Sequence, residues 1–406
     1  MKPTVAVCVA FLCSPFLVAQ TPSPPALIRH ISTYSGFVLV VKADGAVVGW
    51  GREQDGLAAR PRSRSGVVEA PAAIDLPGKA RQVAVGDGAA YALLEDGTVV
   101  SWGTNYDGQL GNGPAGANGV LGVNPKPSVT PVKVTGLADI IQIEAGARPA
   151  IALRKDGTVW AWGSREDGAL GDDSKPTGRV LRVVNALAPV AVPGLEGITQ
   201  IAAGPSFNLA LTRDGHVMAW GTNNYGELGN GTRSTAWTPA PVSGLDHVAA
   251  IAAAKGGGTN VSGAVRDDGT VWVWGSNSSA MMGNGEGPLS PDDPGGRNLL
   301  PLQVKGLAGA RRLSLGMGHA AALLADGTLR MWGHDGFGQI GVGTSGFYHE
   351  KPMKVPALTN VAAVYLGGPH SFAVRADGTL WMWGFGFSGQ GIFGKNLKVP
   401  TLVELE

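Results

Sequence analysis

The sequence has 406 residues, of which 63 are glycine, 16% are charged and 44% are hydrophobic. The hydrophobic content excludes a disordered chain, and the glycine content excludes a long coiled coil. Lys and Arg number 32 against 31 Asp and Glu. With so little net charge, no overall field attracts nucleic acid or an anionic membrane, so we expect no nucleic-acid partner.

Residues 1–19 have the pattern of a secretory signal peptide. Lys2 is the only charged residue before Arg29, residues 5–18 are almost wholly apolar, and Ala19 offers a small residue at the cleavage site. The apolar run is too short to span a membrane. We therefore predict cleavage after Ala19 and an exported protein of bacterial type, periplasmic or secreted. The mature chain is not expected to insert into a membrane.

Both cysteines, Cys8 and Cys13, lie inside this leader. The mature chain would therefore have no disulfide, no thiolate nucleophile and no cysteine metal site. Residues 20–27 are predicted to form a short proline-rich spacer.

From residue 28 onward, one unit recurs seven times, marked by an Asp-Gly pair and a Trp-Gly pair six positions later. The seven pairs are Asp44 and Trp50, Asp96 and Trp102, Asp156 and Trp162, Asp214 and Trp220, Asp268 and Trp274, Asp326 and Trp332, and Asp377 and Trp383. Equal units that fill the chain indicate a single repeat domain over residues 28–406. The expected units cover residues 28–77, 78–135, 136–194, 195–244, 245–305, 306–356 and 357–406.

Each unit is predicted to form four strands, as the fourth unit illustrates. Strand one, Ile201–Ala203, ends at a Gly that stands ten residues before the Asp, and strand two is Leu209–Leu211. Asp-Gly then forms a tight hairpin turn, strand three is His216–Trp220, and strand four carries a Pro-x-x-Val pattern. The Gly that ends strand one is expected at Gly86, Gly146, Gly204, Gly258, Gly316 and Gly367, with Tyr34 in the first unit.

Seven four-stranded antiparallel units around one axis make an all-β, seven-bladed β-propeller. A two-sheet sandwich would not explain seven equal units. The Asp residues are interpreted as turn residues and the Trp residues as core between blades.

The second unit carries Asp96-Gly-Thr-Val-Val-Ser-Trp-Gly103 and then Asn105-Tyr-Asp-Gly-Gln-Leu-Gly-Asn-Gly113. These motifs resemble the regulator of chromosome condensation (RCC) repeat family. The resemblance covers nearly the whole mature chain and implies a seven-bladed propeller. It also implies, as one alternative, guanine-nucleotide exchange on a small GTPase, but an exported, charge-balanced chain would not meet that partner.

The ends of the chain leave the closure of the ring open. The chain begins near strand one of the first unit and ends just after strand four of the seventh. Either side-chain packing alone closes the ring, or residues 21–28 add an edge strand.

Successive loops of an antiparallel blade alternate between the two faces of a propeller. The loops after strands one and three therefore share one face, enlarged by long loops near Pro114–Pro127, Asp172–Asn185 and Glu286–Asn298. Aromatic residues in such loops are typical of interfaces. The candidate binding-face residues are Tyr106, Phe207, Tyr225, His319, Phe337, Phe347, Tyr348, His370, Phe385 and Phe387. We expect a non-catalytic monomer that binds a protein, or a glycan, through this face and needs no cofactor.

His319 and His370 stand three residues after the Gly that ends strand one. A structural role in the turn is favoured, and no third ligand for a metal is evident, so no catalytic or metal-binding residue is assigned. The alternative from another class is an enzyme, a lyase or hydrolase, with its site at the central pocket. These two histidines facing the tunnel would be its first sign.

The export prediction can be tested on the protein purified from the periplasm or the medium. Mass spectrometry of the N-terminal peptide should find a chain that starts at Gln20. A chain that retains Met1 and stays in the cytoplasm would contradict it.

Overall fold

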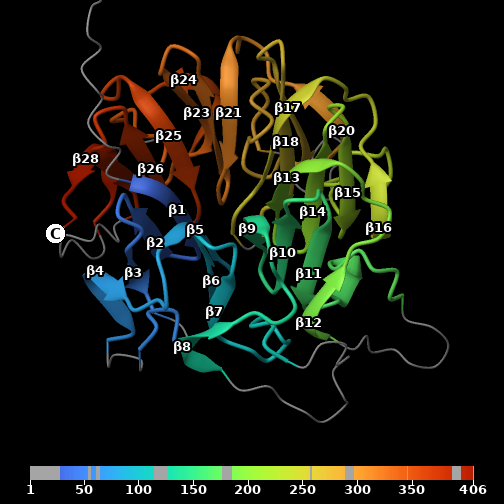
Figure 1. Ribbon diagram of the computed structural model, residues 1–406. Coiled ribbons are helices and arrows are strands. Elements are labelled where there is room, and N and C mark those ends of the chain that lie inside the picture. Colours follow the sequence, from blue (N-terminus) through green and yellow to red (C-terminus); the bar gives the residue numbers. More distant parts are fainter. Residues whose placement is uncertain are drawn as a thin grey trace, which may run out of the picture.

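The computed structural model describes residues 28–53, 56–60, 65–113, 127–175, 185–256, 258–288, 297–344, 346–385 and 395–405. Seven four-stranded antiparallel sheets stand around a central axis as the blades of a propeller (Figure 1). The seven-bladed fold predicted from the repeat is confirmed. Among the described residues the one helical element is the 3-10 turn η1 (Glu166–Gly168), so no helix there could cross a membrane.

Strands follow chain order within each blade. Blade 1 holds β1 (Ile28–Tyr34), β2 (Phe37–Lys42), β3 (Val47–Arg52) and β4 (Val67–Ile74). Blade 2 holds β5 (Ala80–Val85), β6 (Ala89–Leu94), β7 (Val99–Gly103) and β8 (Ser128–Lys133). Blade 3 holds β9 (Ile140–Ala145), β10 (Pro149–Arg154), β11 (Val159–Gly163) and β12 (Ala186–Ala191). Blade 4 holds β13 (Ile198–Ala203), β14 (Phe207–Thr212), β15 (Val217–Gly221) and β16 (Ala236–Pro241).

The last three blades repeat this order. Blade 5 holds β17 (Val248–Ala253), β18 (Val261–Arg266), β19 (Val271–Ser276) and β20 (Arg297–Gln303). Blade 6 holds β21 (Ala310–Leu315), β22 (His319–Leu324), β23 (Leu329–His334) and β24 (Tyr348–Lys354). Blade 7 holds β25 (Val361–Leu366), β26 (His370–Arg375), β27 (Leu380–Gly384) and β28 (Leu397–Val403). The first strand of each blade lies nearest the axis (Figure 1).

The signature tryptophan joins each blade to the blade before it. All seven rings have no exposed surface. The indole N–H of Trp274 donates to the carbonyl oxygen of Glu227 in blade 4 at 2.9 Å, and Trp332 donates in the same way to Met281 at 2.7 Å. Blades 2, 3, 4 and 7 repeat the bond. Each of these six rings therefore fills the space between two blades and also satisfies a buried carbonyl.

The loop after strand three is shaped by its own polar residues. In blade 2 the Asn105 side chain accepts a hydrogen bond from the Leu110 amide at 3.0 Å, and Gln109 accepts one from the Asp107 amide at 2.8 Å. Gly111 follows with φ +58°, and a Cβ there would lie 2.8 Å from the Trp162 ring. This explains the Gln-Leu-Gly motif: its last residue must be small where the loop meets the next blade's tryptophan.

The Asp-Gly pairs form turns, as expected. In blades 1, 2, 3, 5, 6 and 7 the Asp carboxylate accepts a hydrogen bond from the backbone amide two residues on. In blade 4 the carboxylate of Asp214 instead accepts one from the Thr212 hydroxyl. Hydrogen bonds from the turn lower the pKa of Asp96, a carboxyl on the surface. This set of carboxylates has a structural task, since it caps turns at the propeller surface.

The Gly at the end of strand one makes room for the side chain three residues later. A Cβ on Gly316 would lie 2.5 Å from the His319 ring, and one on Gly204 would lie 2.2 Å from the Phe207 ring. Blade 5 departs from the expected pattern. Its first strand ends at Ala253, and the segment to β18 has seven residues, 254–260, where blade 4 has three. The prediction that Gly258 ends this strand was therefore wrong, because the loop that holds it is longer.

Side chains close the ring between blades 7 and 1. The Thr33 hydroxyl and His370 Nε2 form a buried hydrogen bond of 2.6 Å. Trp50 meets Phe372 edge to face, with ring centroids 6.2 Å apart. Within the described residues each blade keeps its own four strands, so packing joins these blades. Of the segment expected as a possible edge strand, Ile28 belongs to β1 and residues 21–27 lie outside the described part of the chain.

We expect Trp274→Phe to lower the free energy of unfolding by about 2–3 kcal/mol. The change removes the indole N–H and leaves a void between blades 4 and 5. Urea denaturation measures it. Trp272→Phe is the matched control, since that ring lies on the same strand, is partly exposed and stacks under Arg266 at 4.9 Å. It should cost less than about 1 kcal/mol. Equal losses in the two variants would contradict the role given to the buried ring.

Acidification should weaken the closure. Burial lowers the pKa of His370 to about 4, below its ordinary 6.5. Between these pH values the unfolded chain binds a proton at this residue that the folded chain does not. The contribution of neutral His370 to the free energy of unfolding is therefore fully present above pH 6.5 and falls as the pH decreases toward 4. His370→Asn should reduce the slope of unfolding free energy against pH by up to about 1.4 kcal/mol per pH unit. Identical slopes for the two proteins between pH 6 and pH 4.5 would refute this.

Candidate functional site

The alternation of strands places two kinds of loop on one face of the ring. The connections β1–β2 and β3–β4, and their equivalents in the other blades, lie on what we call the loop face. The Asp-Gly turns and the crossings between blades lie on the opposite side, the turn face. The long loops expected to enlarge the loop face fall mostly at residues 114–126, 176–184 and 289–296, outside the described residues.

The predicted binding residues divide into exposed and buried sets. On the loop face, Phe347 is 76% exposed and Tyr106 is 54% exposed. Tyr225, Phe337, Tyr348 and Phe385 are partly exposed, and Phe387 lies outside the described residues.

Three of the predicted binding residues, Phe207, His319 and His370, have no exposed surface. Phe207 fills the space above Gly204, and the two histidines pack between blades. Burial lowers the pKa of His319 to about 3. These side chains cannot touch a partner on this surface, so their assignment to the binding face is corrected.

The structure gathers part of the exposed set into one cluster on blades 6 and 7. His334 meets Tyr348 edge to face, with ring centroids 5.4 Å apart, and lies 5.9 Å from Phe337. Phe337 in turn meets Phe385 of blade 7 at 5.3 Å. These rings and Phe347, which directly precedes Tyr348 in the sequence, are together called the aromatic cluster. Tyr106 and Tyr225 lie on blades 2 and 4, away from it.

Polar contacts hold the cluster in place. Gln339 Nε2 lies 2.7 Å from His334 Nδ1, and His349 Nε2 lies 3.0 Å from the Asp335 carboxylate. The Asp335 amide donates to the carbonyl of Phe347 at 2.8 Å. Burial raises the pKa of Asp335 and lowers that of His334. The sequence analysis did not single out Asp335, whose place at the start of the loop is taken by Asn105 in blade 2.

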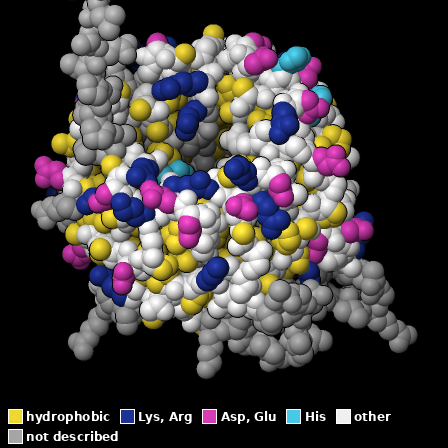
Figure 2. Space-filling model, viewed as in Figure 1, with side chains coloured by type: hydrophobic (Ala, Val, Ile, Leu, Met, Phe, Trp, Pro, Cys, Tyr) yellow, Lys and Arg dark blue, Asp and Glu magenta, His cyan; other side chains and the backbone are white. Residues whose placement is uncertain are grey.

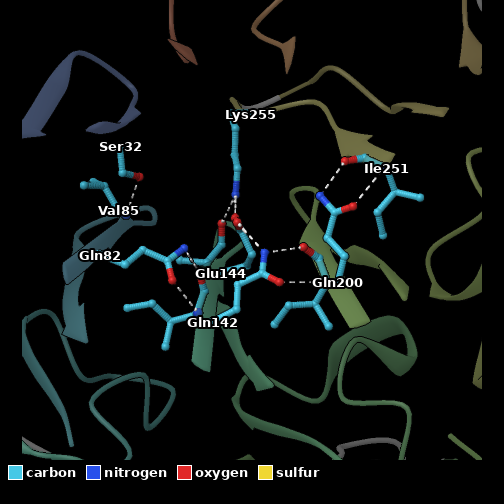
Figure 3. A network of polar contacts seen from close by, with 11 residues as sticks. Ser32, Gln82, Val85, Gln142, Glu144, Gln200, Ile251 and Lys255 are labelled. Carbon is cyan, nitrogen blue, oxygen red and sulfur yellow. Dashed lines mark hydrogen bonds and ion pairs between the residues drawn. The ribbon is translucent and has the colours of Figure 1, made fainter. Parts of the chain in front are cut away.

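A second candidate site lies on the axis. A cavity of about 240 Å³ is lined by residues from the first strands of all seven blades. Lys255, carried by the longer loop of blade 5, reaches across it, and Figure 3 shows its ammonium group meeting the Glu144 carboxylate of blade 3 at 2.6 Å. Lys255 also donates to the Ala145 carbonyl at 3.2 Å. The sequence reading missed this pair because the spacing of Gly258 concealed the longer loop.

In one half of the tunnel wall, glutamine side chains join the inner strands of neighbouring blades by hydrogen bonds. The amide of Gln142 donates to the Ile201 carbonyl at 2.8 Å and accepts from the Ile201 amide at 3.0 Å (Figure 3). Gln82 forms the same pair of hydrogen bonds with the backbone of blade 3, and Gln200 forms it with the backbone of blade 5. Each glutamine thus satisfies a peptide group on the inner edge of the following blade.

The wall of blades 5, 6, 7 and 1 is different. Ala250, Arg312, Ala363 and His30 stand where the other blades have glutamine. Burial is the main cause that lowers the pKa of His30 to about 4, and Lys255 and Arg312 add to the effect while Glu144 opposes it. Figure 2 shows Lys and Arg side chains bordering the hollow in the middle of the molecule.

The cavity lining contains one histidine, His30, among the described residues. The described residues contain no group of three His, Cys, Asp or Glu side chains able to hold a metal. His319 and His370 do not line the cavity, so the sign expected for an enzyme at the central pocket does not appear in these two residues.

The chain belongs to the RCC1-like domain family, which matches residues 12–312. The regulator of chromosome condensation (RCC1) repeat also matches residues 326–374. This confirms the family suggested by the repeat motifs.

The relatives differ in how much of their length this chain covers. It is 29% identical to the ultraviolet-B receptor UVR8 of Arabidopsis thaliana, over 81% of this chain and 70% of that protein. It is 31% identical to the E3 ubiquitin-protein ligase HERC2 of Mus musculus, over 80% of this chain but 6% of that protein. It is 29% identical to the protein pim1 of Schizosaccharomyces pombe, over 79% of this chain and 62% of that protein.

Solved structures share the fold. The crystal structure of human WBSCR16 has a TM-score of 0.73 at 22% identity and covers 89% of this chain and 95% of its own. Yeast RCC1 (Prp20), crystallised with Kap60, has a TM-score of 0.69 at 25% identity and covers 87% and 83%.

Proposed function

We propose that this protein is an exported scaffold that binds another protein through its loop face, with the aromatic cluster as the centre of contact. The observation that carries the proposal is the position of Phe347. This large apolar side chain is 76% exposed, and it directly precedes Tyr348, whose ring meets His334 edge to face. Leaving such a ring in water is unfavourable, and covering it with a partner gains free energy.

The cluster has the composition of an interface. Large aromatic side chains dominate binding energy when a partner covers them, and a fixed ring loses little conformational entropy on binding. Phe337 and Tyr348 are fixed by their contacts with His334 and Phe385, while Met317, on the β21–β22 loop of the same face, adds an apolar side chain 40% exposed.

The relatives support a protein as the ligand. The yeast structure is of RCC1 bound to Kap60, and the study of Prp20p from Saccharomyces cerevisiae names Gsp1p and histones as what it binds. The nucleotide-exchange activity implied by family resemblance stays an alternative prediction. Export after Ala19 would exclude this nucleotide-exchange alternative, because the partner would then be an extracellular or periplasmic protein.

The proposal is tested by affinity capture with the immobilised chain from Gln20 to Glu406. Secreted and periplasmic proteins of the source cell are offered to three baits: wild type, Tyr106→Ser with Phe347→Ser, and a control. The control, Leu300→Ser with Val399→Ser, removes side chains 52% and 48% exposed on the outer strands β20 and β28.

A partner on the loop face should be retained by wild type and control. Its affinity for the loop-face variant should be at least about tenfold lower, since buried aromatic contacts contribute about 2 kcal/mol or more. Equal retention by all three baits would exclude the loop face. A glycan retained through the same residues, with no protein captured, would replace protein by glycan as the ligand.

A further inference from the structure

The tunnel wall is asymmetric because the residue at one position of the first strand differs between the blades. Glutamines in blades 2, 3 and 4 clasp the blade that follows each of them. In blades 5 and 7 this position is Ala250 and Ala363. Without a long amide side chain, the inner edges of blades 6 and 1 lack a hydrogen-bonded glutamine, and space remains beside blade 6.

Beside blade 6 this space is a second hollow, which shares lining residues with the axial cavity. It has a volume of about 390 Å³ and is lined by residues of β17 and β21, among them Ala250 and Arg312. Gln200, Ile251 and Arg312 line both hollows. The two hollows together could hold a small molecule in contact with the wall of blades 5 to 7.

Arg312 is the cation available in this space. Its neighbour Arg311 donates to the Val361 carbonyl at 3.0 Å, and Arg29 pairs with Glu95 at 2.5 Å. Within the described residues the side chain of Arg312 makes no hydrogen bond or ion pair, and Arg312 is exposed. A guanidinium group offers a planar set of donors that fits a carboxylate or a phosphate.

Two further polar side chains line the axial cavity, which Arg312 also lines. His30 and Tyr365 both line the axial cavity, with ring centroids 5.4 Å apart. The Nδ1 atom of His30 is buried and has no hydrogen-bond partner in the described part of the chain. An uncompensated buried polar atom beside a cavity indicates a ligand or a water that completes its bonding.

The one carboxylate of the cavity lining is already neutralised. Glu144 forms an ion pair with Lys255 at 2.6 Å. The longer loop of blade 5 carries Lys255 to this position. The charges of Glu144 and Lys255 cancel each other. With His30 neutral, Arg312 therefore gives the cavity lining a net charge of one positive unit. Repulsion from Glu144 therefore does not exclude an anion.

We infer that the tunnel beside blades 5, 6, 7 and 1 is a binding site for a small oxyanion, a carboxylate or a phosphate. Arg312 supplies the charge, and His30 and Tyr365 supply hydrogen bonds. The site is separate from the loop face, so it stands whether or not a protein binds there.

The test uses the chain from Gln20 to Glu406 and three salts at equal ionic strength: sodium butyrate, sodium phosphate and sodium chloride. Isothermal titration calorimetry measures binding, and the thermal midpoint is recorded beside it, since a ligand that binds the folded state raises the midpoint. Butyrate binding identifies a carboxylate site and phosphate binding a phosphate site, and either supports the inference.

Arg312→Gln should weaken oxyanion binding at least tenfold, and Arg330→Gln, an arginine on β23 that does not line the cavity, should leave it unchanged. In NMR spectra the imidazole resonances of His30 should shift on titration, and those of His216, 58% exposed beside an Asp-Gly turn, should not. The inference is overturned by binding that survives Arg312→Gln. It is equally overturned if butyrate and phosphate act no differently from chloride, or if the His30 resonances stay still.

Discussion

The hydrogen bond that six of the seven signature tryptophans donate to a loop carbonyl of the preceding blade is the contact on which the rest of the structure depends. A propeller blade shares no backbone ladder with its neighbours, so side chains must both fill the gap and satisfy the polar groups within it. The indole ring does both at once. It requires a small residue such as Gly111 where the loop meets the ring, and it fixes that loop to the next blade.

Fixing the loops in this way gives the protein its candidate binding face. The same loops that accept the tryptophan bonds carry Tyr106, Phe337 and Phe347 toward solvent. Their inner parts belong to the core and their tips do not. A partner would therefore meet side chains already held in position, which lowers the entropic cost of binding. The axial tunnel follows from the same construction, because seven inner strands cannot meet at a point.

The sequence predicted the blade number and strand order because every unit needs an Asp-Gly turn and, six residues later, a tryptophan that packs against the neighbouring blade. It could not predict the burial of Phe207 and His319, since that depends on how closely a glycine backbone approaches the ring. Nor could it predict the contact of Lys255 with Glu144, which lie 111 positions apart. The pair depends on a longer loop that the spacing of Gly258 concealed. The aromatic cluster was visible only as separate residues, because its members meet across two blades.

The central claim is that, within the part of the chain that the structure describes, side-chain contacts and not an exchanged strand close the ring between blades 7 and 1. Hydrogen–deuterium exchange of the whole chain, resolved by peptide, tests it most directly. If the account is right, β1, β2, β25 and β26 exchange as slowly as the inner strands β9, β10, β13 and β14. Fast exchange confined to blades 1 and 7 would show that the ring opens at the Thr33–His370 junction, and would contradict the account.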